Sequence, residues 1–189
     1  MISDLVKANR SYRRFHEEKQ ISVDTLRELI NLGRLSPSGA NLQPLKYMIS
    51  ADPEMNEKIF PSLAWAGYLK DWPGPEVGER PSAYIILLCD TEIKKDPGCD
   101  QGIAAQSILL GAVEKGLGGC MIGSINRDQL RQSLGIPDRY DIVLVLALGY
   151  PKEQVMIEDA GPDGDIKYYR DANRVHHVPK RPLSEIILE

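Results

Sequence analysis

The feature of the sequence that most restricts its fold is a helical segment without a polar face. Asp100 is a favourable N-cap residue, and a helical pattern follows it over residues 101–115. A helix on a protein surface normally keeps one polar side. Here apolar residues lie on nearly every side of the helix: Ile103, Ala104, Ala105, Ile108, Leu109, Leu110, Ala112 and Val113. We therefore predict a buried central helix with other elements packed around it.

Two apolar runs predict strands that belong to the same core. Residues 83–89 and 142–148 are uninterrupted apolar runs, which is typical of buried strands. Weaker patterns predict further strands at 46–51 and 120–122, and helices at 23–35, 53–59 and 127–134. Helices and strands alternate without repeats, and 189 residues with 42% hydrophobic content suit a single domain over residues 1–189.

The C-terminal part of the chain changes character along its length. Residues 151–177 are polar and are expected to be rich in loops. Residues 182–188 return to apolar character and need a surface to cover them. In a chain of this size, such a segment either docks on its own core or crosses to a second subunit.

Charge and cysteine content exclude several classes of function. The net charge is -4, from 23 basic and 27 acidic side chains, so no overall attraction to nucleic acid or to an anionic membrane is expected. The longest apolar runs have seven residues, whereas a membrane-spanning helix needs about 20. Residues 1–4 lack the basic and apolar regions of a secretory signal, which favours a cytoplasmic protein. The three cysteines form no Cys-x-x-Cys pair and no histidine completes a ligand cluster, so no metal site is predicted.

Two short polar segments on either side of the 23–35 helix point to a phosphorylated ligand. Residues 10–15 read Arg-Ser-Tyr-Arg-Arg-Phe and offer guanidinium groups and a hydroxyl suited to phosphate. Residues 36–44 read Ser-Pro-Ser-Gly-Ala-Asn-Leu-Gln-Pro and offer small residues, amides and backbone suited to a flat polar ring. Taken singly, the first also fits a solvated basic face and the second a loop that ends a helix. Together they predict a cofactor with both a phosphate and a ring.

A glycine-rich segment at residues 116–124 is a third candidate for ligand binding. It is not a dinucleotide-binding fingerprint, because Met121 stands where that motif needs glycine and because the segment follows a helix instead of a strand. It does permit close backbone approach. The amides of Gly123 and Ser124 therefore suit the edge of a planar ligand.

These segments form an ordered set that resembles a known family. The set comprises Arg-Ser-x-Arg-x-Phe at 10–15, the 36–44 segment, Asp-x-Gly-Ile-Ala-Ala-Gln at 100–106, the glycine-rich 116–124 segment, and Lys-Arg-Pro-Leu at 180–183. The chain resembles the nitroreductase family of flavin mononucleotide (FMN) enzymes over nearly its whole length. The resemblance implies an α+β fold, with a central, mostly antiparallel sheet flanked by helices. It also implies an obligate homodimer with an exchanged C-terminal segment and one FMN in each of two sites at the subunit interface.

The resemblance assigns expected roles to particular residues. The FMN phosphate and ribityl chain would be bound by Arg10, Ser11, Arg13, Lys180 and Arg181. The isoalloxazine ring would be approached from the other subunit by Pro37, Ser38, Gly39, Asn41 and Gln43. The backbone of Gly123 and Ser124 would face the reactive ring nitrogen, although well-known members carry a glutamate where Gly123 stands. No catalytic side chain is expected, because the flavin carries the chemistry.

The implied activity is hydride transfer from NADH or NADPH, through the flavin, to a nitroaromatic, quinone or related acceptor, with ping-pong kinetics. One alternative is a flavin carrier or sensor without enzymatic activity. Another is a specialised enzyme of the same fold that performs reductive dehalogenation or flavin breakdown. The choice of substrate is expected to depend on residues 61–81, where three aromatic side chains either line the substrate pocket or pack the segment on the core: Trp65, Tyr68 and Trp72.

Overall fold

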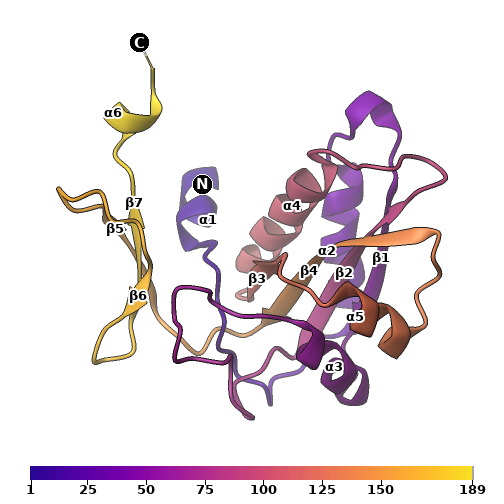
Figure 1. Cartoon of the computed structure of the whole chain (residues 1–189), viewed down its shortest axis with the longest axis horizontal. Helices are drawn as coiled ribbons and strands as arrows, with labels where there is room; N and C mark the ends of the chain where they lie inside the picture. Colours follow the sequence, from indigo (N-terminus) through magenta and orange to yellow (C-terminus); the bar gives the residue numbers. More distant parts are fainter. Residues whose placement is uncertain (189) are drawn as a thin grey trace.

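The two long apolar runs form the two central strands of an antiparallel sheet (Figure 1). We describe residues 1–188 in a computed structural model. Strands β2 (Ala83–Asp90) and β4 (Tyr140–Gly149) pair with each other, β1 (Leu45–Ser50) pairs with the outer side of β2, and β3 (Gly118–Ile122) pairs with the outer side of β4. The predicted central antiparallel sheet is therefore confirmed.

Helices cover both faces of this sheet because β2 and β4 are apolar on both sides. Helices α2 (Val23–Leu35) and α4 (Asp100–Glu114) share one cluster with Ile85 and Leu87 of β2. Helices α3 (Pro53–Ile59) and α5 (Arg127–Leu134) share the other with Ile86 and Leu88. Alternate residues of a strand point to opposite faces, so one apolar run supplies two cores. The result is an α+β fold in three layers.

Local signals set the ends of the shorter helices. Ser22 accepts a hydrogen bond from the backbone N–H of Thr25 at 3.0 Å and caps α2, as predicted. Asp52 caps α3 and Asn126 caps α5 in the same way. Helix α5 ends at Leu134 and is capped by Gly135, whose φ of 62° is left-handed and favours glycine. These local rules explain why the predicted bounds of α2, α3 and α5 are confirmed.

The start and the burial of α4 differ from the prediction. The N-cap is Cys99, and Asp100 is already helical because its carboxylate binds Ser38 and Gly39 in another segment. The helix packs on α2 and the sheet, yet Ile103 remains 39% exposed. One side of the predicted central helix is therefore not covered by the chain itself.

Residues 155–188 form a C-terminal arm beside the main body (Figure 1). Its three-stranded sheet places β7 (His176–Lys180) between β5 (Val155–Asp159), which is parallel to it, and β6 (Tyr169–Arg170), which is antiparallel. The loop-rich prediction for residues 151–177 is confirmed for most of the segment, but it did not include these short strands. The strands were missed because they are short and half-exposed, which leaves no clear alternation.

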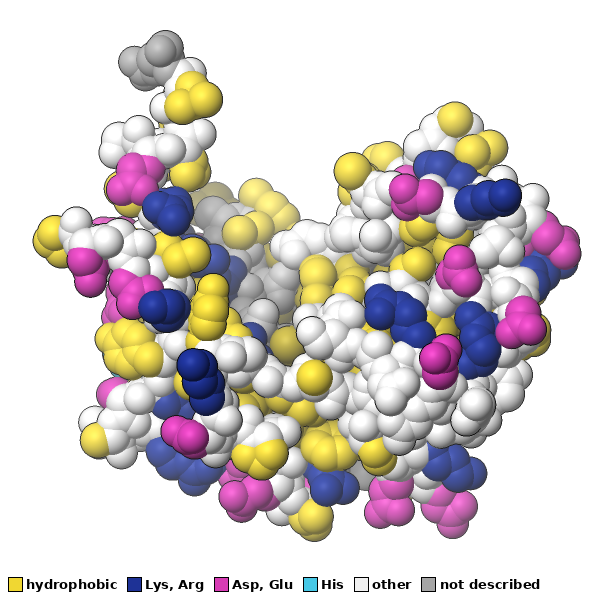
Figure 2. All heavy atoms as spheres, in the orientation of Figure 1, with side chains coloured by type: hydrophobic (Ala, Val, Ile, Leu, Met, Phe, Trp, Pro, Cys, Tyr) yellow, Lys and Arg dark blue, Asp and Glu magenta, His cyan; other side chains and the backbone are white. Residues whose placement is uncertain are grey.

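The end of the C-terminal arm does not dock on the main body. Helix α6 (Leu183–Ile186) and the residues after it leave Leu183 69% exposed and Leu188 95% exposed. Figure 2 shows a hollow between the arm and the body. Helix α1 (Ile2–Ala8) lies beside this hollow and also carries exposed apolar side chains. Within residues 1–188, no helix has both the length and the apolar character needed to cross a bilayer.

Candidate functional site

The N-terminal motif, residues 10–15, runs in extended form beside β3. The backbone N–H of Tyr12 donates to the carbonyl of Gly119 at 3.0 Å, and Ser11 forms a parallel bridge with the same glycine. In extended backbone, neighbouring side chains point in opposite directions. Arg13 and Arg14 therefore diverge and have different partners.

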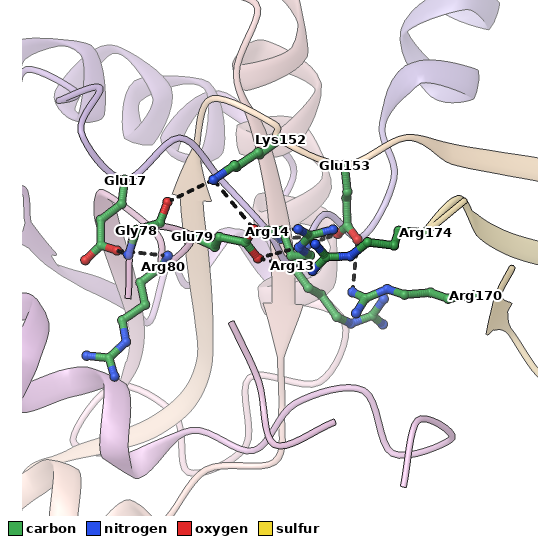
Figure 3. A network of polar contacts seen from close by, with 10 residues as sticks. All are labelled: Arg13, Arg14, Glu17, Gly78, Glu79, Arg80, Lys152, Glu153, Arg170 and Arg174. Atoms are coloured by element: carbon green, nitrogen blue, oxygen red, sulfur yellow. Dashed lines mark hydrogen bonds and ion pairs between the residues drawn. The ribbon is translucent and has the colours of Figure 1, made fainter. Parts of the chain in front are cut away.

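Arg14 is a buried structural residue. Its guanidinium donates two hydrogen bonds to the carboxylate of Glu79, and the two side chains are 6% and 13% exposed (Figure 3). Lys152 Nζ lies 3.5 Å from the same carboxylate. The hydrogen bonds from Arg14 lower the pKa of Glu79 to about 2. The pair fastens the end of the 61–81 segment to the N-terminal motif, a role that the sequence did not indicate.

Glu153 joins the same motif to the C-terminal arm. Its buried carboxylate accepts hydrogen bonds from the backbone N–H groups of Arg13 and Arg14 (Figure 3). It also accepts one from Arg170 Nη2 at 3.0 Å. A buried carboxylate needs such partners, and here they come from both ends of the chain. Sequence reasoning missed Glu153 because its partners are about 140 and 17 residues away.

Four of the predicted phosphate ligands line one groove of about 340 Å³, which we call the phosphate groove: Arg10, Ser11, Arg13 and Lys180. Arg10 Nη2 donates to the carbonyl of Val6 at 2.7 Å, while its Nε is buried and has no hydrogen-bond partner among the described residues. Burial lowers the pKa of Arg10. A buried, unpaired guanidinium N–H is a donor that an anion would satisfy. Arg181 does not line this groove and instead pairs with Glu185 at 3.1 Å.

A second pocket of about 230 Å³, the β3 pocket, continues the phosphate groove. Gly123 and Ser124, whose backbone is expected to face the ring, line it together with Trp65. Arg13, Met121 and Tyr168 line both hollows, so the two form one path along β3. A Cβ atom added at Gly123 would meet no heavy atom within 4 Å. The backbone at this end of the path is therefore open to a ligand.

The 36–44 loop lies elsewhere and is held by Asp100. The Asp100 carboxylate accepts hydrogen bonds from Ser38 Oγ at 2.7 Å and from the N–H of Gly39 at 2.9 Å. Ser38 Oγ in turn accepts one from the N–H of Gln43 at 2.9 Å. The hydrogen bond from Ser38 holds the pKa of Asp100 below its usual range. Asn41 and Gln43 have left-handed φ values of 55° and 52°, which this carboxylate-centred network supports.

One chain does not bring this loop to the phosphate groove. Pro37, Ser38 and Gln43 line a separate pocket of about 220 Å³. Two residues of α4 line that pocket, Asp100 and Ala104, which are four residues apart and share a helix face. The phosphate groove is lined by Gln106 and Leu109, which share a different face of α4. The predicted ring-binding loop and the predicted phosphate ligands therefore lie on different sides of α4.

We expect Asp100→Ala to loosen the 36–44 loop. The substitution removes two hydrogen bonds to a carboxylate, each with a net contribution of about 1.5–3 kcal/mol. Amide exchange in residues 38–43, followed by mass spectrometry or NMR, should become at least about tenfold faster. The control is Asp96→Ala, whose carboxylate accepts from the N–H of Gly98 outside the loop. Equal exchange in the two variants would contradict the assignment.

The three aromatic residues of the 61–81 segment differ in their surroundings. Trp65 lines the β3 pocket, and its Nε1 is buried without a partner in the described structure. Tyr68 packs on Tyr168 with ring centroids 4.8 Å apart. Trp72 lies under the guanidinium of Arg170, with 4.1 Å between Cζ and the ring centroid. The last two therefore pack the segment on the C-terminal arm.

Comparisons with known proteins show the family and the fold of the chain. The family model described as the nitroreductase family matches residues 6–83 and 95–150. An Archaeoglobus fulgidus protein, provisionally named an NADH dehydrogenase/NAD(P)H nitroreductase, is 29% identical over 149 residues, which cover 75% of this chain and 80% of that protein. The iodotyrosine deiodinase of Thermotoga neapolitana is 26% identical over 171 residues, with coverage of 81% and 90%. The structure of the NADPH:FMN oxidoreductase of Vibrio harveyi with NAD+ aligns with a TM-score of 0.67 at 20% identity, covering 99% of this chain and 76% of that one.

Proposed function

Because the chain belongs to the nitroreductase family, we propose that it is an FMN-dependent oxidoreductase that passes hydride from NADH or NADPH to an aromatic or quinone-like acceptor. The names of its relatives support this proposal, since they include an NAD(P)H nitroreductase and an NADPH:FMN oxidoreductase. The observation that carries it is the continuous path along β3, with basic side chains at one end and open backbone at the other.

The residues along this path fit FMN. Arg10 and Lys180 supply positive charge beside the Ser11 hydroxyl, and the unpaired Nε of Arg10 offers a donor to the phosphate. Arg13 lies where the two hollows meet, a position suited to the ribityl chain. Gly123 and Ser124 offer backbone to the ring edge without a side chain in the way. The phosphate, the ribityl chain and one edge of the ring would therefore each have a partner.

The bound flavin would supply hydride transfer, so the protein needs to bind, orient and shield it. Arg10 and Lys180 would bind the phosphate and set the register along β3. The backbone at Gly123 and Ser124 would orient the ring, and Trp65 would exclude water on that side. No side-chain acid or base is assigned.

We propose that the complete site contains a second copy of the chain. Pro37, Ser38 and Gln43 line a pocket on another face of α4, so their loop is suited to the flavin of a partner. The exposed apolar end of the C-terminal arm needs a covering surface. The hollow beside the arm leaves room for a second copy of the chain to supply that surface. An exchanged homodimer satisfies both. The cytoplasmic location stays a prediction from the sequence.

The similarity to iodotyrosine deiodinase favours a second candidate, the reductive removal of halogen from an aromatic substrate. The same flavin path would serve it, and the difference would lie in the acceptor. Trp65 lines the β3 pocket, where such an aromatic ring would lie against it.

We expect the purified chain, mixed with FMN, to become yellow and to lose its colour on anaerobic addition of NADH or NADPH. Reoxidation by a nitroaromatic, a quinone and a halogenated tyrosine, each added alone, then identifies the acceptor class. Failure to bind FMN would refute the proposal. Binding of FMN without bleaching by either nucleotide would support a flavin carrier or sensor in its place. Equilibrium sedimentation of the same sample should give a dimer.

A further inference from the structure

His176 is a buried imidazole in direct contact with Arg13. It begins β7, it is 1% exposed, and its Nε2 lies 3.1 Å from Arg13 Nη1. A guanidinium only donates hydrogen bonds and stays charged in proteins. Nε2 must therefore be the acceptor, which puts the imidazole proton on Nδ1. The contact requires one tautomer of the neutral ring.

The surroundings of His176 keep the ring neutral. Two cations face it: Arg13 from the N-terminal motif and Arg170 from β6; His177 follows it in β7. Burial, with these groups, lowers the pKa of His176 to about 4. The Glu153 carboxylate is occupied by Arg170 and by backbone N–H groups. The phenol ring of Tyr168 covers another side, with 5.2 Å between ring centroids.

Arg13 needs such a partner because of where it lies. Arg13 lines both the phosphate groove and the β3 pocket, so a small shift in the position of its guanidinium changes the shape of both hollows. Its Nη1 also donates to the carbonyl of Ser11 at 3.2 Å, and its Cζ lies 4.9 Å from the centroid of the Tyr168 ring. Among these contacts, His176 is the side-chain acceptor.

We propose that His176 is a positioning residue, whose neutral Nε2 holds the Arg13 guanidinium at the junction of the two hollows and so prepares the site for FMN. This inference rests on the proposed function, since FMN is the ligand that Arg13 is prepared for. A different role would make His176 itself a cationic ligand of the phosphate. The two roles predict opposite effects of positive charge at position 176.

NMR of the flavin-free protein tests the contact without any ligand. Long-range ¹H–¹⁵N spectra of the imidazoles should show His176 neutral at pH 7 with its proton on Nδ1. In Arg13→Ala the preference for that tautomer should be lost, while the spectrum of His177 is retained. His177 is the matched neighbour, because its Nδ1 lies 2.9 Å from Glu158 and makes no contact with Arg13 in the described structure. A proton on Nε2 of His176 in the wild type would overturn the inference.

Binding of FMN at pH 7.5, followed by quenching of flavin fluorescence, tests the consequence. His176→Gln offers an uncharged acceptor near the same place and should bind within about threefold of the wild type. His176→Leu removes the acceptor and should bind about tenfold more weakly, as for loss of one hydrogen bond to a charged group. His176→Lys carries a fixed positive charge beside Arg13 and should bind more weakly still. His177→Gln should bind as the wild type does.

The outcomes separate this inference from the proposed function. A wild type that does not bind FMN would refute the proposed function and the flavin part of the inference together. A wild type that binds FMN, with His176→Leu unchanged or His176→Lys tighter, would overturn the inference alone. Circular dichroism checks the fold of each variant; if His176→Lys does not fold, the Gln and Leu variants and the tautomer still decide the question.

Discussion

Replacing Arg14 with leucine should lower the free energy of unfolding by about 3–5 kcal/mol. The change removes the main partner of the Glu79 carboxylate, whose side chain is 13% exposed in the wild type. Loss of the main partner of a largely buried charge is one of the few causes of such a large effect. Urea denaturation of the wild type and the variant measures it.

A pair of controls isolates the buried ion pair. Arg27→Leu breaks an exposed pair with Asp24 and should change stability by less than about 0.5 kcal/mol. The double variant Arg14→Leu/Glu79→Leu should be less destabilised than the sum of the two single variants, because neither charge is left alone. A loss of under about 1 kcal/mol for Arg14→Leu would contradict a structural role for Arg14.

The same pair fixes the sign of the acid dependence. The folded-state pKa of Glu79 is lowered from 4.5 to about 2, so its contribution to stability is present above pH 4.5. It is lost as the pH falls from about 4.5 towards 2. Glu79→Gln should therefore flatten that part of the stability profile.

The second large effect concerns FMN. Arg10→Ala and Lys180→Ala should each weaken FMN binding by roughly tenfold to a hundredfold, because each removes a charged partner of the phosphate. Riboflavin has the same ring but no phosphate, so its affinity should stay within about threefold in both variants. Fluorescence titrations with the two flavins measure the difference, and Arg27→Ala serves as a control with an exposed cation removed.

Two results would contradict this assignment. Equal weakening of FMN and riboflavin would mean that the substitutions damage the site in general. Unchanged FMN binding would remove the phosphate from the groove that Arg10 and Lys180 line. Raising the salt concentration should weaken FMN binding in the wild type more than in either variant, since fewer charges remain to be screened.

Patterns local in the sequence predicted the layers of the fold. The runs that became β2 and β4 and the capped helices α2 and α5 were recognisable because burial and capping act on neighbouring residues. The start of α4 could not be recognised in this way, because the Asp100 side chain binds Ser38 and Gly39, which are more than 60 residues away in the chain. The C-terminal sheet was missed for a similar reason, since β5 and β7 are stabilised by pairing across a long connection.

The sequence by itself determined the layered core and the ordered set of polar segments, because apolar runs and motif residues carry those properties wherever the chain places them. Only the tertiary structure decided how adjacent residues divide their roles. In the folded chain, Arg13 contacts His176 and lines the phosphate groove, whereas Arg14 pairs with Glu79. The tertiary structure also put the 36–44 loop on another side of α4. Such choices depend on partners that are distant in the chain, and a side chain's neighbours in sequence do not specify them.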